Sequence, residues 1–369
     1  MKIWKYKRLS ECSNFVSERT SNIAIDNYIS TENMIENRGG VKEAAALPDV
    51  KSTSAYKPND ILLSNIRPYF CKIWFADKKG SCSNDVLVVR AKKEVDPKFL
   101  YYVLSDQNFF NWDSMTSKGT KMPRGTPNAI MKYSVPDLPF HTQQKIASIL
   151  SAYDNLIQNY KKQIEALQTG TCELYKEWFV RFRFPGYQTT KFENGIPEGW
   201  KIEKVKNCVN RLPFGQTYKK DELEPEGNVI VIDQSEDEYL GYHNNEPSHK
   251  ASAENPIALF GDHSCKYKLM IKDFSLGENI IPYTSKGVDL YYLYYSVYKI
   301  VQTEEYKRHW NLFVNKKVLI PNNELQKSFR QKVIPIFKQI EILNKQISNL
   351  TQQRDLLLPR LMSGKLEVE

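Results

Sequence analysis

The sequence lacks the features of a membrane or secreted protein. No uninterrupted apolar run reaches about eighteen residues, and the amino terminus, MKIWKYKRLSE, has no apolar segment of the kind found in secretory signals. No two cysteines have the spacing of a zinc finger; the six are Cys12, Cys71, Cys82, Cys172, Cys208 and Cys265. We therefore expect a cytoplasmic protein with free thiols and without a metal or other cofactor.

Motifs of catalysis are also missing. There is no Asn-Pro-Pro-aromatic or Asp-Pro-Pro-aromatic run of an amino-methyltransferase, and no glycine-rich phosphate loop. Pro48-Asp49 and Pro136-Asp137 could each begin a nuclease-like site, but neither precedes an acidic-x-lysine strand, so turns are favoured. No histidines pair at helical spacing; the five are His141, His243, His249, His263 and His309. We expect no catalytic residues.

The charge of the chain permits a polyanionic partner. Lys and Arg outnumber Asp and Glu by 52 to 43, which gives a formal net charge of +9 and an isoelectric point of about 9.0. The basic residues are spread along the chain rather than gathered in a tail. Many basic proteins never bind nucleic acid, so charge alone does not establish DNA binding.

Two stretches, 139–179 and 321–361, carry apolar residues at alternating steps of four and three, as in a heptad coiled coil. The first seam is Ile146, Leu150, Tyr153, Ile157, Tyr160, Ile164, Leu167, Thr171, Leu174 and Trp178. A shift of 183 positions gives the second, which is Phe329, Val333, Ile336, Ile340, Leu343, Ile347, Leu350, Arg354, Leu357 and Leu361. Only the equivalent positions Thr171 and Arg354 are not apolar.

A narrow seam over five heptads needs a partner helix. We expect the two helices to pair with each other, antiparallel and within one chain. Helices in the core of ordinary globular domains are an alternative, but those average about a dozen residues. Pairing with a second copy of the chain is another alternative. Pro335 should kink the second helix or leave that turn irregular.

The globular parts repeat as well. Trp4-Lys5 and Cys12 are matched by Trp200-Lys201 and Cys208 at an offset of 196. Short β-rich runs such as 61–63, and a helix opened by Asp96-Pro97, indicate mixed α and β structure. The fold class predicted is therefore α+β, a pseudo-twofold tandem repeat. Its parts are a globular domain at 1–138, a long helix at 139–184, a second globular domain at 185–320 and a C-terminal long helix at 321–369.

Several motifs together resemble a known family. They are Val135-Pro136-Asp137-Leu138-Pro139 before the first long helix, Gln143-Gln144-Lys145-Ile146 just after it begins, Pro197-Glu198-Gly199-Trp200, and Leu357-Leu358-Pro359-Arg360-Leu361 near the end. In this order and duplication they resemble the specificity (S) subunit of type I restriction-modification systems. The family pattern is only loosely repeated at Asn323-Glu324-Leu325-Gln326, and Thr142 stands where an acidic residue is usual.

The resemblance implies a non-catalytic subunit of a DNA adenine-N6 methyltransferase and restriction complex, active in host defence. Two target recognition domains would each read one half of an asymmetric bipartite sequence in double-stranded DNA. The long helices would set the spacer and bind two methyltransferase (M) subunits, which use S-adenosylmethionine, and endonuclease (R) subunits would join through the complex. Paired helices of about 35–40 residues, with a rise of about 1.5 Å per residue, would separate the two target recognition domains by roughly 50–60 Å.

Candidate DNA-binding residues in the first half form two groups. Lys118, Thr120, Lys121 and Arg124 lie in a glycine-containing loop, where the alternative is a solvated basic loop. Asn65, Arg67, Tyr69 and Lys72 follow the strand at 61–63 and combine a base reader, an aromatic ring and phosphate partners; the alternative is a charged edge strand.

The second half has three candidate groups. They are Lys219 and Lys220; His263, Lys266 and Lys268; and Arg308, His309 and Asn311. Trp310, within the last group, is more often a core residue than a base-stacking one. Apolar residues off the seam, including Tyr175, Phe179, Leu356 and Leu358, could contact methyltransferase subunits or pack on the chain itself.

Two other functions remain as alternatives. The first is a coiled-coil scaffold with two protein-binding heads, and its DNA binding would be absent or insensitive to salt. The second is an undetected nuclease.

Overall fold

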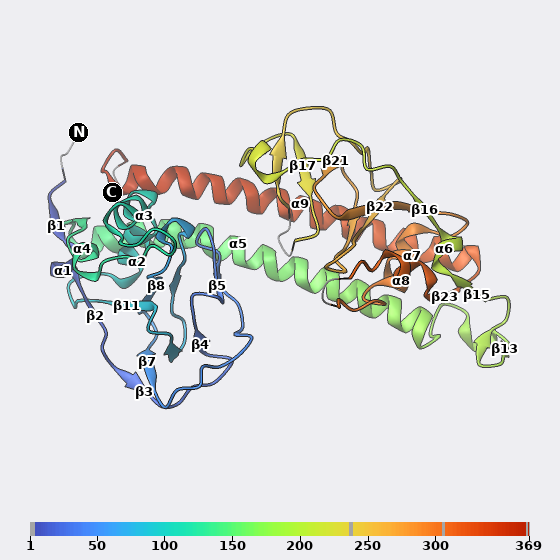
Figure 1. Cartoon of the computed structure of the whole chain (residues 1–369), viewed down its shortest axis with the longest axis horizontal. Coiled ribbons are helices and arrows are strands. Elements are labelled where there is room, and N and C mark those ends of the chain that lie inside the picture. The colour runs from blue at the N-terminus through green and yellow to red at the C-terminus, as the bar shows by residue number, and fades with distance from the viewer. Residues whose placement is uncertain (1–3, 236–238, 305–306, 367, 369) are drawn as a thin grey trace. The chain divides into compact units, whose positions relative to one another are not determined.

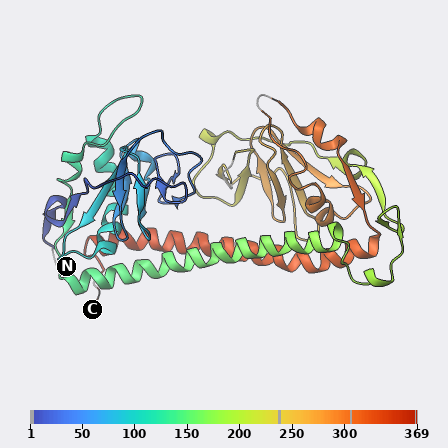
Figure 2. The ribbon, with the colours of Figure 1, turned by 90° about the horizontal axis from the view of Figure 1, so that it is seen from below.

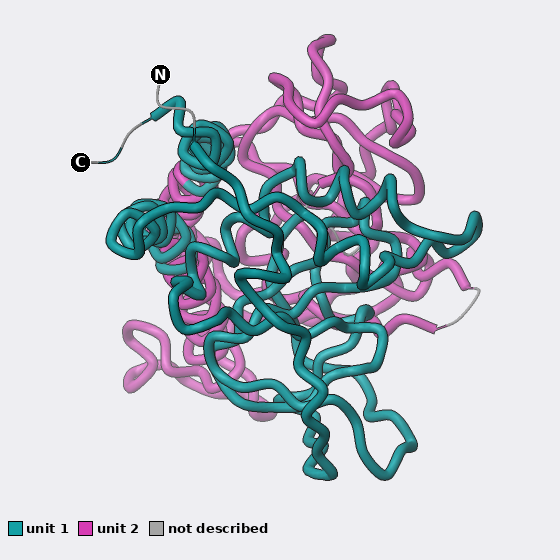
Figure 3. Tube along the Cα trace, turned by 90° about the vertical axis from the view of Figure 1, so that its left-hand side faces the viewer, with its two compact units in different colours: residues 1–159, 347–369 teal, residues 160–346 magenta. Residues whose placement is uncertain are grey.

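The computed structural model describes residues 4–235, 239–304, 307–366 and 368 (Figure 1). The chain divides into two compact units, coloured separately in Figure 3. Unit 1 comprises residues 1–159 and 347–369, and unit 2 comprises residues 160–346. The two long helices, α5 (Phe140–Tyr175) and α9 (Asn323–Met362), each contribute one part to unit 1 and the other part to unit 2.

The main sheet of unit 1 has four antiparallel strands in the order β2, β11, β8, β9. These strands are β2 (Ser13–Phe15), β11 (Val86–Ala91), β8 (Ile61–Ser64) and β9 (Ile73–Phe75). Alternate side chains of the central strand β8 enter different cores, as the twofold period of a strand requires. Ile61 and Leu63 belong to one core and Leu62 to another. The predicted strand at 61–63 is confirmed.

A second sheet and two strand pairs complete the strands of unit 1. The second sheet has the order β3 (Arg19–Thr20), β7 (Thr53–Tyr56), β10 (Gly80–Cys82), β4 (Tyr28–Ile29), in which β10 and β4 run parallel. The pairs are β5 (Met34–Ile35) with β6 (Gly40–Val41), and β1 (Tyr6–Arg8) with β12 (Ser134–Pro136).

The short helices of unit 1 are α1 (Leu9–Cys12), α2 (Pro97–Ser105), α3 (Gln107–Thr116), α4 (Pro127–Ile130) and the 3-10 turn η1 (Pro68–Phe70). Helix α2 begins as predicted, with a proline in its first turn, where the missing N–H has no intrahelical partner to lose. The side chain of Asp96 caps it by accepting a hydrogen bond from Phe99 N at 2.8 Å.

The main sheet of unit 2 repeats the strand order of unit 1. Its strands, in order, are β16 (Val209–Arg211), β22 (Ile280–Ser285), β19 (Ile257–Gly261) and β20 (Tyr267–Met270). The preceding helix α6 (Val205–Cys208) and β16 lie 196 positions after α1 and β2, which is the offset found in the sequence. The sequence repeat therefore corresponds to a repeated topology.

The other elements of unit 2 surround this sheet. A second sheet has the order β18 (Gly241–His243), β17 (Val229–Ile232), β21 (Phe274–Leu276). Two strand pairs are β15 (Lys201–Lys204) with β23 (Lys317–Ile320) and β13 (Phe192–Glu193) with β14 (Ile196–Pro197). The short helices are η3 (Tyr187–Thr189), η4 (Lys220–Glu222), α7 (Leu290–Val297) and α8 (Trp310–Asn315). The predicted mixture of helices and strands is confirmed.

The two long helices pack on each other within each unit. In unit 1, Ile146 and Leu150 of α5 share a core with Leu358 and Leu361 of α9. In unit 2, Leu174 of α5 and the segment after it share a core with the start of α9, where the ring centroids of Trp178 and Phe329 lie 6.1 Å apart. All twenty seam positions predicted from the heptad pattern are buried or half-buried. The two helices therefore share a core in each unit.

Two irregularities mark the long helices. A π-helical turn, η2 (Lys176–Val180), follows α5 directly. Pro335 was expected to kink α9 or leave a turn irregular, but the α-helix continues through this residue. The carbonyl group left without an N–H partner belongs to Gln331, which is exposed, so water can solvate it.

Candidate nucleic-acid interface

A basic loop in unit 1 connects α3 to α4. Lys118 and Arg124 close it through a pair of backbone hydrogen bonds, Lys118 N to Arg124 O and Arg124 N to Lys118 O, both 2.9 Å. Gly119 has φ of +96°, a conformation that other residues adopt only with strain. Lys118, Thr120, Lys121 and Arg124 are all exposed. We call residues 117–125 the basic loop.

The basic loop is held against the segment that follows β8. Gly125 N donates to Asn65 O at 3.0 Å, and Arg67 N donates to Pro123 O at 2.8 Å. Ile66 forms an isolated bridge with Arg124. The structure thus brings together the two groups of residues that the sequence offered as DNA readers in the first half.

Side chains after β8 differ in how freely they project. Tyr69 is 53% exposed, whereas Arg67 and Lys72 are half-buried. The guanidinium of Arg67 lies 5.8 Å from the ring centroid of Phe70, and Lys72 Nζ donates to Thr31 O at 2.9 Å. Tyr69 is therefore the most available of these side chains.

A buried carboxylate that the sequence analysis missed lies beneath the basic loop. Asp113 of α3 has no exposed surface, and neither of its carboxylate oxygens has a hydrogen-bond partner among the described residues. Burial raises the pKa of Asp113 to about 7. The mixed polar and apolar sequence around Asp113, Asn111-Trp112-Asp113-Ser114-Met115, gave no signal that its side chain is buried.

In unit 2, Asp262 joins two of the candidate groups. Its Oδ1 accepts hydrogen bonds from His309 N at 3.1 Å and Trp310 N at 2.9 Å. His263 Nδ1 lies 3.0 Å from Lys307 O. The turn after β19 and the segment before α8 are therefore held together, as the segment after β8 and the basic loop are in unit 1.

His309 is a correction to the predicted set. Its side chain is fully buried, and its two ring nitrogens are both engaged, Nδ1 with Asp262 O at 3.0 Å and Nε2 with Glu304 N at 2.9 Å. The ring therefore fixes the loop and has no nitrogen left for a base. Trp310 is half-buried and packs on Phe313, with 5.3 Å between ring centroids, as expected of a core tryptophan.

The remaining candidates of unit 2 lie in several places. Arg308 and Asn311 are exposed beside His309. Lys266 Nζ donates to Ser235 O at 2.7 Å, and Lys268 is half-buried on β20. Lys219 and Lys220 are exposed at η4, in a segment that bridges to β21 and β18 of the second sheet.

The two loop pairs occupy equivalent positions in the two units. β8 and β19 hold the same place in sheets of the same order. In each unit, the turn after this strand binds the segment that leads into the last short helix before β12 or β23. Within each unit, the segment before that helix lies away from the long helices (Figure 2).

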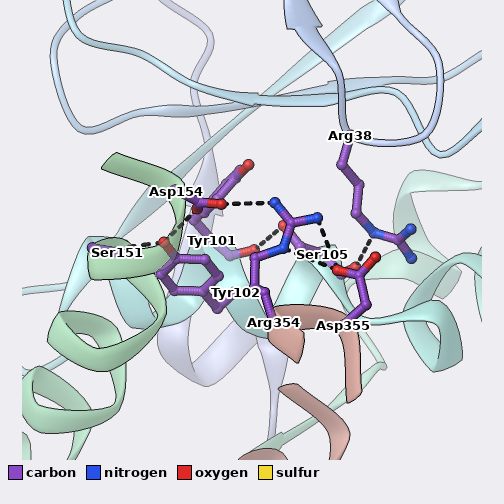
Figure 4. A network of polar contacts seen from close by, with 8 residues as sticks. All are labelled: Arg38, Tyr101, Tyr102, Ser105, Ser151, Asp154, Arg354 and Asp355. Carbon is purple, nitrogen blue, oxygen red and sulfur yellow. Dashed lines mark hydrogen bonds and ion pairs between the residues drawn. The ribbon is translucent and has the colours of Figure 1, made fainter. Parts of the chain in front are cut away.

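A polar network fills the irregular position of the second seam (Figure 4). Arg354 Nη1 pairs with Asp154 Oδ1 at 2.7 Å, and Nη2 pairs with Asp355 Oδ1 at 2.8 Å. Tyr102 of α2 donates to Asp154 Oδ2 at 2.6 Å, and its hydroxyl also lies 3.3 Å from Ser151 Oγ. The network therefore ties both long helices to the globular part of unit 1.

The apolar side chains off the seam mostly pack on the chain itself. Phe179 is buried against Tyr292, with 4.7 Å between ring centroids, and Leu358 is buried in the core of unit 1. Tyr175 is half-buried. Leu356 differs, being 58% exposed, and it lines a surface cavity of about 530 Å³ with Pro359, Arg360, Ser363 and Lys365.

Neither a membrane span nor a metal site is found in the part of the chain that the structure describes. No helix there is long and apolar enough to cross a bilayer. No three side chains of His, Cys, Asp or Glu gather there in a way that could hold a metal ion. All six cysteines are free.

Comparison with known proteins identifies relatives of the chain. Residues 1–169 match the family described as type I restriction modification DNA specificity domain. The MjaIX specificity subunit of Methanocaldococcus jannaschii is 27% identical over 75% of this chain and 71% of its own length. The MjaVIII specificity subunit of the same organism is 24% identical over 99% of this chain and 93% of its own length.

A solved structure has the same fold. The crystal structure of the type I restriction-modification system S subunit from M. genitalium matches with a TM-score of 0.57 at 17% identity, covering 100% of this chain and 98% of that one. The HindI specificity subunit of Haemophilus influenzae is 22% identical over 99% of this chain and its own whole length. These matches confirm the resemblance predicted from the sequence.

Proposed function

We propose that this chain is a specificity subunit of a type I restriction-modification system, the group of proteins that it resembles, and that it reads an asymmetric bipartite sequence in double-stranded DNA. The globular domains at 1–138 and 185–320 are the two target recognition domains, and each reads one half-site. The chain catalyses no reaction itself. It directs two methyltransferase subunits to the site, and endonuclease subunits join through the complex.

One observation carries this proposal. The basic loop in unit 1 and the segment before α8 in unit 2 bind equivalent turns of equivalent sheets. In each unit, the turn and the segment bound to it both carry residues that the sequence predicts to bind DNA. A repeated topology that presents polar and basic side chains at the same place twice suits a target with two half-sites.

The proposed DNA contacts follow exposure. Exposed cations and polar groups approach phosphates or base edges directly; they are Lys118, Thr120, Lys121, Arg124, Lys219, Lys220, Arg308 and Asn311. Tyr69 offers a ring for stacking. Half-buried residues can present part of their side chains to the DNA; they are Asn65, Arg67, Lys72, His263, Lys266 and Lys268. We exclude His309 because its ring is buried.

We assign the long helices the role of a spacer. Helix α5 has 36 residues, so it is about 54 Å long at about 1.5 Å per residue. An antiparallel coiled coil of these two helices, closed at Ile146, Leu150, Phe329 and Val333 among others, would hold the domains at a fixed separation. The distance between half-sites then becomes part of the recognised target.

Salt dependence of DNA binding tests the proposal. The chain purified with its methyltransferase partner should bind duplex DNA with an affinity that falls steeply as salt rises, by a slope of about 0.9 per phosphate contact on logarithmic axes. A scaffold with protein-binding heads would show no such slope. Metal-dependent DNA cleavage by the isolated chain would contradict a non-catalytic role.

A further inference from the structure

Asp113 and Asn65 meet in a small buried site beneath Gly125 of the basic loop. A Cβ atom added at Gly125 would lie 2.5 Å from Asp113 Oδ1 and 2.8 Å from Asn65 Oδ1. Both oxygens are buried and have no hydrogen-bond partner among the described residues. Both accept hydrogen bonds, so an ionised Asp113 would leave two acceptors together with no donor between them.

No cation of the loop segments neutralises Asp113. The pKa of Asp113 is raised to about 7 by burial alone, without a contribution from a charged neighbour. Arg124 pairs instead with Asp85, at 3.2 Å. The guanidinium of Arg67 lies over the ring of Phe70. Lys118 and Lys121, on the basic loop, are exposed to solvent.

The other segments packed against α3 supply no counter-charge either. Arg38 packs on α3, but its Nη2 donates to Gln107 Oε1 at 2.9 Å and its guanidinium lies 5.4 Å from the ring centroid of Phe110. Lys98 of α2 places its Nζ 4.2 Å from the ring centroid of Phe75. Helix α4, Pro127–Ile130, carries no ionisable side chain, and Tyr69 is the only ionisable residue of η1. Within α3 and its cap, Asp106 is the other acidic residue, and its side chain accepts from Asn108 N at 2.8 Å.

We propose that Asp113 holds a proton in the folded chain and donates a hydrogen bond to Asn65 Oδ1, which fixes the side-chain amide of Asn65. Asn65 is half-buried, so the bond turns its Nδ2 away from the buried site. Asp113 is a positioning residue in this arrangement, because it acts on DNA only through Asn65. The inference deepens the proposed function and rests on it for its consequence in DNA reading.

The consequence concerns base preference. A fixed Nδ2 donor favours acceptors on a base edge, such as guanine N7 and O6 or thymine O4. If Asp113 were ionised, the amide would turn to bring Nδ2 to the carboxylate, and Asn65 would offer Oδ1 to donors such as adenine N6 or cytosine N4. The proton on Asp113 thus selects which hydrogen-bonding group Asn65 presents.

Unfolding of the free chain tests whether Asp113 is protonated in the folded state, and it needs no DNA. The folded-state pKa of Asp113 lies above its unfolded value of about 3.9, so the contribution of Asp113 to the stability of the wild-type chain falls as pH rises towards about 7. Asp113→Asn keeps a donor that does not titrate. Its unfolding constant relative to wild type should therefore fall about tenfold per pH unit from about pH 5 to about pH 7. Glu94→Gln, at an exposed carboxylate, is the matched control.

A ratio between wild type and Asp113→Asn that stays constant with pH would overturn the proposal. Because this experiment uses no DNA, its outcome is independent of whether the chain reads DNA. The experiment also separates a protonated Asp113 from one that is buried but ionised. Only a protonated Asp113 makes the ratio of the unfolding constants of Asp113→Asn and wild type change with pH.

Binding by the complex with the methyltransferase tests the consequence. Duplexes carrying each base pair at each position of the first half-site should reveal one position where wild type loses roughly tenfold of its discrimination between about pH 6 and about pH 8.5. Asp113→Leu should lack this discrimination between base pairs at both pH values, and Asp113→Asn should retain it at both. Equal discrimination in all three proteins would overturn the role in base preference. Loss of both half-sites together would instead count against the proposed function.

Discussion

Gln143 and Gln326 make the same two hydrogen bonds, each in its own unit. Gln143 Oε1 accepts from Asp96 N at 2.9 Å, and its Nε2 donates to Leu138 O at 2.8 Å. Gln326 Oε1 accepts from Asp289 N at 2.7 Å, and its Nε2 donates to Pro321 O at 2.8 Å. Both side chains are buried, each with 2% of its surface exposed.

These bonds join the start of each long helix to the cap of a short helix. Asp96 caps α2, and Asp289 caps α7 by accepting from Tyr291 N at 3.0 Å and Tyr292 N at 3.2 Å. Each glutamine therefore fixes the angle at which the chain leaves a globular domain. If the long helices set the spacer, these two glutamines anchor each end of it.

Replacing either glutamine by alanine should destabilise its unit. Gln143→Ala leaves the Asp96 N–H and the Leu138 carbonyl without partners in a buried site, so we expect a loss of about 1–3 kcal/mol in the free energy of unfolding. Gln144→Ala removes an exposed neighbour of the same type and should cost under about 0.5 kcal/mol. Denaturant unfolding measures both, and equal effects would contradict the role assigned to Gln143.

The Asp154–Arg354 pair should show strong coupling. Arg354→Ala leaves the Asp154 carboxylate with the Tyr102 hydroxyl but without its counter-charge in a largely buried site, and we expect a loss of about 2–4 kcal/mol in the free energy of unfolding. Replacing both residues by leucine removes both charges and places an apolar residue at the Arg354 seam position, so it should recover most of that loss. A double-mutant cycle of Asp154→Leu, Arg354→Leu and the two together, followed by denaturant unfolding, measures the coupling. Additive effects of the two single substitutions would show that the pair contributes nothing.

The basic loop should act on one half-site. Lys121→Ala and Arg124→Ala each remove a cation proposed to contact DNA, and each should lower the salt slope of binding by about one. Methylation should weaken wherever recognition of the first half-site is required. Lys93→Ala removes an exposed lysine elsewhere in unit 1 and serves as the control. An unchanged salt slope and methylation rate in both loop variants would remove the basic loop from the interface.

Changing the length of both long helices should change only the spacer. One heptad inserted in each helix adds about 10.5 Å, which corresponds to about three base pairs of duplex DNA, and preserves the seam. The expected product is a methylation motif with the same half-sites and a longer gap. A motif whose half-sites changed while the gap stayed constant would contradict the spacer role.

The repeat and the seams could be predicted because they depend on local periodicity. The offset of 196 between Cys12 and Cys208 reappears as equivalent helices, and the heptad pattern names twenty positions that are buried or half-buried. The loose match at Asn323-Glu324-Leu325-Gln326 obscured Gln326, whose bonds nevertheless repeat those of Gln143. The two glutamines correspond because each bonds to the residue that caps a short helix far away in the sequence, and the spacing of residues does not reveal such contacts.

The site was harder to predict because its contacts join distant segments. The bond between Gly125 N and Asn65 O links positions 60 residues apart, and nothing in either segment indicates the other. His309 was a candidate DNA reader, but its backbone N–H and its ring are bound by Asp262, 47 residues earlier, and the side chain is buried. Arg354 looked like a defect in the seam, yet Asp154 makes it part of a network.

A genome-wide map of N6-methyladenine tests the central claim most directly. It would compare cells with and without this gene, with the methyltransferase partner present in both. We predict that one bipartite motif, with two half-sites at a fixed gap, loses its methylation when the gene is deleted and regains it on complementation. An unchanged map, under conditions where the chain and its partner are both produced and form a complex, would contradict the proposed function.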